Sequence, residues 1–386
     1  MKRLRPRPLT ACWYLLVIAF VCGGAFEVMD NLLGLRTLNF ESSAPTVFKI
    51  AKELVIALTM TVATVRWGMP RISMFGLYVT FIMIFAFLPQ LFALPTQSFS
   101  RAGLFYFIAS IAMLFYASAV YRPGMEDGFA RKFLLPIIVI TLTTQLLEAQ
   151  FAPSSLYFET NAFGLDRRAG IAAIPTTAGV LGVIGFVSLR GVPRLLSGLV
   201  IGMANSSLSL ICLVAAIAFM TKRRIYLLIG LPWVIAIAGF VIATRPGIGA
   251  SISTRLDILA DTVGTLRLFG PSQIGALATA KSVALAPFDS VIVDSFYLEV
   301  LHVCGIVPGV LLIGALLTTI YRRAGALAFL VFAISGVGFL TLEAWIVWIS
   351  ILFGLRLPAG ARLRARLRKR VPAAAHNLPL SATAAE

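Results

Sequence analysis

The chain has 386 residues, of which 59% are hydrophobic and 13% are charged. Soluble globular domains contain about 45–50% apolar and about 25% charged residues, so this composition excludes a soluble enzyme and a disordered protein. It predicts an all-α polytopic membrane protein. The formal net charge is nevertheless +17, from 33 basic and 16 acidic residues, and the position of that charge needs an explanation.

Apolar segments predict membrane spans, each of which needs about 20 residues, along most of the chain. The first span follows basic residues as in a signal peptide, but no small-residue cleavage site follows it, so we expect it to be retained. With the segment 195–220 included, we expect about 10–12 spans. The predicted spans are 11–27, 50–65, 72–94, 102–121, 133–149, 170–189, 225–243, 296–320, 325–341 and 343–356.

The segment 195–220 is also apolar but is interrupted by Asn205-Ser206-Ser207. Cytoplasmic loops of membrane proteins are enriched in Lys and Arg, and with the N-terminus inside most basic connections fall on the inner side. This pattern holds only if 195–220 forms two half-helices that enter and leave on one side, which is tolerated where they line a cavity or are buried in protein. The alternative is one long tilted helix with serines bonded to its own backbone.

With this orientation, residues 1–356 form a single transmembrane domain and residues 357–386 form a basic cytoplasmic tail. The inner segments hold most of the basic residues, so the net charge mainly orients the chain. Attraction to anionic lipid is sufficient explanation for the basic tail. No nucleic-acid-binding module accompanies the charge, so no nucleic acid is expected as a partner. Two long outer segments, 151–169 and 244–293, remain as candidates for function.

Arginines on the outer side are the informative charges. Arg167 and Arg168 lie where the first outer segment meets the span at Gly170. They either snorkel to the interface or clamp an anion, since guanidinium binds phosphate oxygens in bidentate fashion. Arg245 and Arg255 flank a glycine-rich turn and could equally form surface ion pairs.

Ionisable residues also occur at the start of the span 296–320. Asp294 precedes that span, where a helix N-cap is the simple explanation. Glu299 and His302 are three residues apart and share a helix face. A mutual hydrogen bond explains them, and a role in proton transfer is the alternative. The four cysteines form no metal or disulfide motif, so no metal site is predicted.

Two local patterns resemble the O-antigen polymerase and O-antigen ligase families. Arg168 is followed by ten residues and Gly179, and Asp294-Ser295 is followed by nine residues and Gly305. The stretch Thr254-Arg255-Leu256 with Leu268-Phe269-Gly270 is similar to a third family pattern. The Asn-Ser-Ser break falls where the family often has a Ser-Arg-Gly motif. The resemblance covers about residues 160–320.

The resemblance implies a GT-C-like fold and a glycosyltransferase that needs no cofactor. Such a polymerase joins undecaprenyl-pyrophosphate-linked oligosaccharide repeat units into a surface or secreted polysaccharide at the outer face of the bacterial inner membrane. Its partners would be that lipid-linked substrate, membrane lipids, a chain-length regulator and export proteins. The implied catalytic residues are Arg168 and Arg255 as cations for the pyrophosphate and Asp294 or His302 as base; the implied substrate-binding residues are Arg167, Arg245, Arg267 and Glu299.

Two other functions remain open. Asp294 stands where ligases have His, which favours a polymerase, but a ligase that transfers glycan to another acceptor uses the same donor. A flippase or transporter without catalytic activity would show repeated halves and short outer loops. The segment 244–293 is long and the two halves of the chain differ, which favours an enzyme.

Overall fold

The computed structural model describes residues 7–33, 46–67, 74–93, 111–112, 114–118, 128–152, 167–172, 174–221, 266–270, 295–337 and 345–355, with isolated positions between 232 and 264. All regular secondary structure within these residues is helical. The predicted spans 102–121 and 225–243 lie largely outside the described residues, and the basic tail lies wholly outside them.

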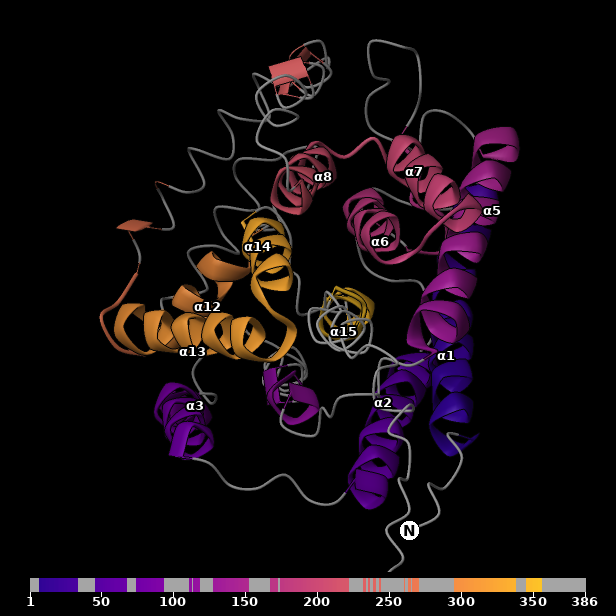
Figure 1. The fold of residues 1–386 in the computed structure, drawn as a ribbon. Helices are drawn as coiled ribbons and strands as arrows, with labels where there is room; N and C mark the ends of the chain where they lie inside the picture. The colour runs from indigo at the N-terminus through magenta and orange to yellow at the C-terminus, as the bar shows by residue number, and fades with distance from the viewer. Residues whose placement is uncertain are drawn as a thin grey trace, which may run out of the picture.

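The described helices overlap the predicted spans, and Figure 1 shows their arrangement. In chain order they are α1 (Arg7–Leu33), α2 (Thr46–Trp67), α3 (Met74–Ala93), the π-helical turn η2 (Ala130–Leu134), α5 (Leu135–Phe151), the 3₁₀ turn η4 (Gly170–Ala172), α6 (Pro175–Ser188), α7 (Val192–Ala204), α8 (Ser207–Met220), α12 (Phe296–Cys304), α13 (Ile306–Ala324), α14 (Ala326–Ser335) and α15 (Trp345–Gly354).

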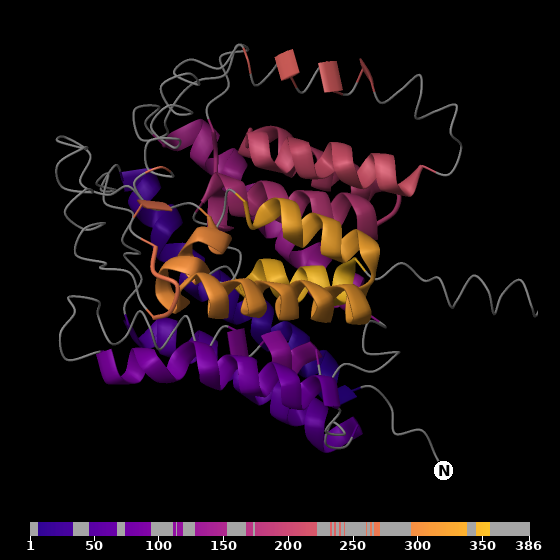
Figure 2. The same cartoon turned by 90° about the vertical axis from the view of Figure 1, so that its left-hand side faces the viewer.

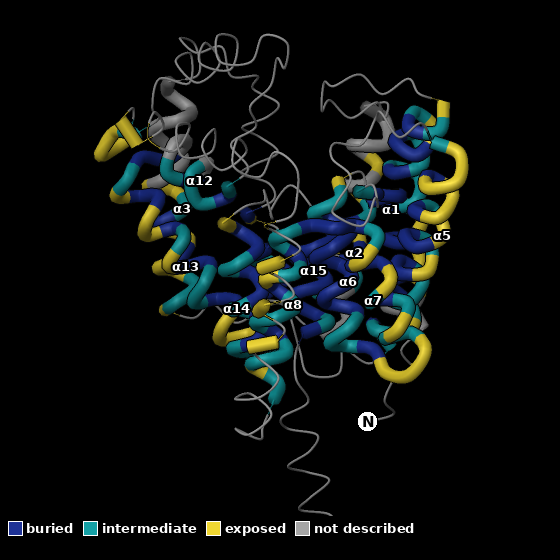
Figure 3. The backbone as a smooth tube through the Cα atoms, turned by 90° about the horizontal axis from the view of Figure 1, so that it is seen from above, coloured by how far each residue is buried: buried dark blue, intermediate teal, exposed yellow. Residues whose placement is uncertain are grey.

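Three helices within the described residues are long and apolar enough to cross a membrane, namely Ala11–Leu33, Ala130–Phe151 and Ile306–Ala324. Large apolar side chains cover the outside of the bundle, as Phe81, Leu195 and Val310 illustrate. Figure 3 shows exposed positions on the outer faces of α3, α5 and α13 around a buried centre. Because water disfavours such an apolar exterior, these features indicate a membrane protein.

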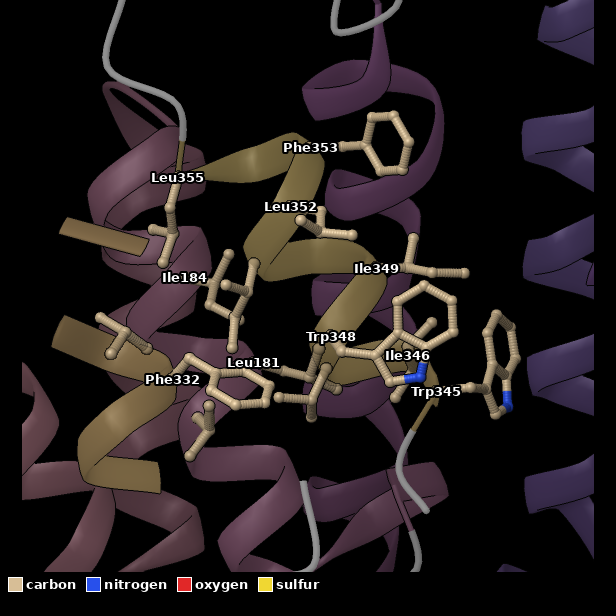
Figure 4. Close-up of a cluster of buried hydrophobic side chains, with 14 of the residues drawn as sticks. Leu181, Ile184, Phe332, Trp345, Ile346, Trp348, Ile349, Leu352, Phe353 and Leu355 are labelled. Atoms are coloured by element: carbon tan, nitrogen blue, oxygen red, sulfur yellow. The ribbon is translucent and has the colours of Figure 1, made fainter. Parts of the chain in front are cut away.

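Helix α15 forms the centre of the bundle. Every residue from Trp345 to Phe353 is buried, and α15 contacts α6, α13, α14 and η2. Figure 4 shows Leu181 of α6 and Phe332 of α14 beside the α15 side chains. A helix that is apolar all round is expected at the core of a large helical protein, since it has no face to offer to water. Figure 2 shows α13, α14 and α15 stacked in the orange-to-yellow part of the chain.

Glycines on one face of α6 let α7 approach closely. A Cβ built on Gly182 would lie 2.7 Å from Ile201 Cγ1 and 3.0 Å from the Ser197 carbonyl oxygen, and one on Gly185 would lie 2.5 Å from Ser197 Oγ. Gly179 continues this face towards the N-terminus of α6. Small residues at such an interface bring helix backbones together, which is the main source of association between membrane helices. Because Gly182 faces Ile201 and the later Gly185 faces the earlier Ser197, α6 and α7 are antiparallel.

The predicted break in 195–220 is confirmed. Helix α7 ends at Ala204, Asn205 adopts a left-handed conformation with φ 43° and ψ 43°, and α8 begins at Ser207. A Cβ on Gly179 would lie 3.4 Å from the Ala204 Cβ and 2.5 Å from the Ser209 Cβ, so the end of α7 and the start of α8 lie at one level beside α6. Both α7 and α8 pack against α6, so the chain changes direction at the break.

Two predicted spans differ in detail. The α-helix of the span 170–189 begins only at Pro175, because residues 170–172 form the 3₁₀ turn η4 and proline is favoured at the first position of an α-helix. The span 296–320 is divided at Gly305, where φ is 88°. Glycine adopts this conformation without the steric cost that a Cβ would bring, so α12 and α13 meet there as separate helices.

Candidate functional site

An irregular segment, residues 167–172, which ends in the 3₁₀ turn η4, is inserted among α1, α5 and α7. The Arg168 backbone N–H donates to the Met203 carbonyl at 2.9 Å, and Gln145 Nε2 donates to the Arg168 carbonyl at 2.9 Å. A Cβ on Gly24 of α1 would overlap the backbone of Ile171. Non-helical backbone at membrane depth is tolerated where protein groups satisfy it, and here α5 and α7 supply those groups.

Glu148 is the principal side-chain anchor of this segment. Its Oε2 atom accepts the backbone N–H of Gly170 at 2.8 Å, and its Oε1 atom accepts Asn31 Nδ2 of α1 at 2.8 Å. Thr144, one turn earlier on α5, accepts the N–H of Ile171 through its Oγ1 atom at 2.9 Å. The segment is thereby tied to two helices, because the carboxylate bridges α1 and the loop from its position on α5.

The polar cluster contains ionisable side chains that are buried away from water. Arg168 and Glu27 are each 4% exposed, and Glu148 is fully buried. Glu27 lies four residues before Asn31 on α1, so the two share a helix face. Ionisable groups within membrane helices are costly, face the protein interior and commonly mark functional sites. The buried polar cluster formed by Glu27, Asn31, Gln145, Glu148 and Arg168 is the candidate functional site.

The α7–α8 break adjoins the cluster, because Met203 in the last turn of α7 accepts from the Arg168 backbone. Ser206 precedes α8 without a side-chain cap, and its carbonyl accepts the first helical bond, from the Leu210 N–H at 3.0 Å. A helix N-terminus carries unpaired N–H groups and partial positive charge. Arg168 is buried on a segment whose backbone bonds to the end of α7, and an arginine together with a helix N-terminus favours an anionic group, phosphate above all.

A second irregular junction joins residues 266–270 to the start of α13. The Ile306 N–H donates to the Arg267 carbonyl at 2.9 Å, and the Gly270 N–H donates to the Cys304 carbonyl at 3.2 Å. A Cβ on Gly305 would lie 2.9 Å from the backbone of Phe269, so this close approach requires glycine. The structure thus brings together two stretches that the sequence patterns had singled out, Leu268-Phe269-Gly270 and the residues after Gly305.

The predicted site residues fall into three groups. Arg167, half-buried, and Arg168 belong to the buried cluster, whereas Arg267 is exposed at the α12–α13 junction. Figures 1 and 3 place α12 and α13 across the central helix α15 from α1 and α5, so the structure does not bring Arg267 next to Arg168.

Glu299 and His302 lie on α12 with side chains outside the described part. Arg245, Arg255 and Asp294 also lie outside the described residues.

Sequence reasoning did not place Glu27, Asn31, Gln145 or Glu148 in the site. The available signal was their spacing, because polar residues four apart on α1 and three apart on α5 each share a helix face. In the part of the chain that the structure describes, no three His, Cys, Asp or Glu residues are grouped to hold a metal ion.

No family model, curated protein or solved structure matches the chain. Its class therefore rests on its own structure. The described residues form an all-helical bundle with three helices suited to cross a membrane. A charged polar cluster and the α7–α8 break lie within that bundle.

Proposed function

We propose that the chain is a polysaccharide polymerase with a GT-C-like bundle of about 10–12 spans. It joins undecaprenyl-pyrophosphate-linked oligosaccharide repeat units at the outer face of the bacterial inner membrane. The observation that carries the proposal is the burial of Arg168 on an irregular segment beside the α7–α8 break.

The leaving group of this reaction explains why a buried arginine is useful. A lipid pyrophosphate gains negative charge as its bond to the sugar breaks, and fixed cations in a low-dielectric site stabilise that charge strongly. The guanidinium of Arg168 offers bidentate donors, and the N-terminus of α8 adds partial positive charge. A lipid-linked donor also suits a site inside the bundle, since the donor reaches it from the bilayer.

The polarity of the bundle supports an outer location for this site. Helix α5 begins beside Arg131 and Lys132 and ends beyond Glu148, and α6 runs back from the Arg168 segment towards Arg190. Basic residues therefore gather at the end of these helices opposite Arg168. Because basic connections favour the cytoplasmic side, Arg168 belongs at the outer side.

In the proposed step, a hydroxyl at the non-reducing end of a new repeat unit attacks the anomeric carbon of the growing chain. A glycosidic C–O bond forms and the C–O bond to pyrophosphate breaks. The hydroxyl proton passes to a base, for which Asp294 and then His302 remain the sequence-based candidates. The pyrophosphate leaves on its polyprenyl carrier, stabilised by Arg168 and by Arg255.

The test uses a strain that lacks the gene and carries variants on a plasmid. Deletion should leave single repeat units on the lipid carrier. Arg168→Ala and Arg168→Lys should each lower polymer formation by about 10²–10³, the range for loss of one fixed donor to developing charge. Arg190→Ala is the matched control, because it removes an exposed arginine from the opposite end of the bundle.

Polymer length and the amount of protein in the membrane are measured together. Normal long polymer in the Arg168→Lys strain would refute the assignment of the site. Full-length polymer that is no longer attached to its acceptor would indicate a ligase instead. Lipid-linked units trapped at the cytoplasmic face would indicate a transporter.

A further inference from the structure

The segment that carries Arg168 contains only the short 3₁₀ turn η4 and no α-helical turn, so contacts with neighbouring helices hold it in place. Within residues 167–172, the recorded side-chain anchors come from α5: Gln145 to the Arg168 carbonyl, Thr144 to the Ile171 N–H and Glu148 to the Gly170 N–H. Thr144 and Gln145 make neutral hydrogen bonds. Glu148 contributes a fully buried carboxylate, which is far more costly to place in a membrane bundle than an amide.

The geometry around Glu148 suits a carboxylate in particular. A carboxylate only accepts hydrogen bonds, and its two oxygens here face two donors, Asn31 Nδ2 and the Gly170 N–H, each at 2.8 Å. A glutamine at this position would turn an NH₂ group towards one of those donors. Hydrogen bonds to a charged acceptor are also about twice as strong as neutral ones.

We propose that Glu148 is a positioning residue that fixes the location of the Arg168 guanidinium for the departing pyrophosphate. It acts through the Gly170 N–H, two residues along the chain from Arg168, and it links that loop to α1 through Asn31. This inference rests on the proposed function, because it assigns Glu148 a part in the same reaction. Glu148 itself contacts no substrate in this scheme.

An exchange of hydrogen-bond polarity between Glu148 and Asn31 tests the inference. Glu148→Gln alone sets an amide NH₂ against a donor, and Asn31→Asp alone sets two carboxylates against each other in a buried site. In the double variant the new amide at 148 still accepts from Gly170 through its oxygen and donates to the new carboxylate at 31. The hydrogen-bond pattern and the net charge are both restored.

Each variant is purified in detergent and assayed with lipid-linked repeat units from the deletion strain. We expect kcat of Glu148→Gln to fall at least tenfold with a small change in KM, because a misplaced cation is felt mainly in the transition state. We expect the double variant to recover most of the lost kcat. Thermal unfolding of all four proteins, measured in parallel, reports the same pairing in the folded state.

Three results overturn the inference. Glu148→Gln could keep the wild-type kcat while Arg168→Lys loses it. The double variant could recover thermal stability but not kcat, which would make the pair structural only. It could also recover neither, which would contradict the polarity argument itself. Failure of the proposed function is seen separately, as normal polymer in the deletion strain, and the thermal measurement then still tests the pairing.

Discussion

The close approach of α7 to α6 depends on Gly182, and Gly182→Ala tests it directly. The added Cβ would lie 2.7 Å from Ile201 Cγ1, 3.0 Å from the Ser197 carbonyl oxygen and 3.2 Å from the Ile201 backbone nitrogen. Favourable carbon contacts occur at about 3.5–4.0 Å. Two of the three neighbours are backbone atoms, and the β-branched Ile201 side chain has little rotamer freedom in a helix. The helices must therefore separate.

The cost follows from two opposing terms. Overpacking a well-packed core costs about 1–3 kcal/mol. Replacing glycine by alanine inside a helix stabilises the folded state by about 0.5–1 kcal/mol. We therefore expect Gly182→Ala to lower the free energy of unfolding by up to about 2.5 kcal/mol, with a central value of about 1 kcal/mol.

The assay is thermal unfolding of the purified protein in detergent, followed by circular dichroism. The matched control is Gly202→Ala on α7, because a Cβ there would meet no atom within 4 Å. The control should melt at or slightly above the wild-type temperature, and Gly182→Ala should melt below it. A Gly182→Ala protein that melts as high as the Gly202→Ala protein would refute the packing argument.

Two further changes test the turn and the core. Asn205 has φ 43°, a left-handed conformation that costs most residues with a Cβ about 1–2 kcal/mol but that Asn and Gly adopt readily. In thermal unfolding, the Asn205→Gly protein should therefore be more stable than the Asn205→Ala protein. The reverse order would contradict a left-handed turn. Trp348 is 1% exposed, and its Nε1 atom has no hydrogen-bond partner in the described part of the chain. Trp348→Ala should lower the free energy of unfolding by about 3–5 kcal/mol. Trp348→Phe should lower it much less, because phenylalanine keeps most of the buried ring and removes the unpaired N–H. Equal losses of stability in the two variants would count against this account.

Local sequence signals were sufficient for the helices and for one break. The apolar runs placed α3, α5 and α15 close to their observed bounds, because hydrophobicity over about 20 residues is the dominant requirement of a membrane helix. The Asn205-Ser206 turn was also predicted. Two independent signals, polar residues in an apolar run and the side on which Lys222 and its neighbours should fall, pointed to the same position.

The break at Gly305 was not predicted, because a single glycine in an apolar run carries little information. What makes it a break is the approach of residues 266–270, whose backbone bonds to Cys304 and Ile306 need a residue without a Cβ. That contact joins segments distant in the chain. The hydrophobic pattern within either segment does not predict this contact.

The sequence by itself determined that this is an apolar, helical chain, and it singled out Arg168. Only the tertiary structure decided what surrounds that arginine. Glu148 lies 22 residues before Gly170 and Asn31 lies 117 residues before Glu148, yet the three meet through hydrogen bonds of 2.8 Å. Hydropathy reports the transfer of each segment into the membrane, whereas the pairing of buried polar groups depends on which helices pack together.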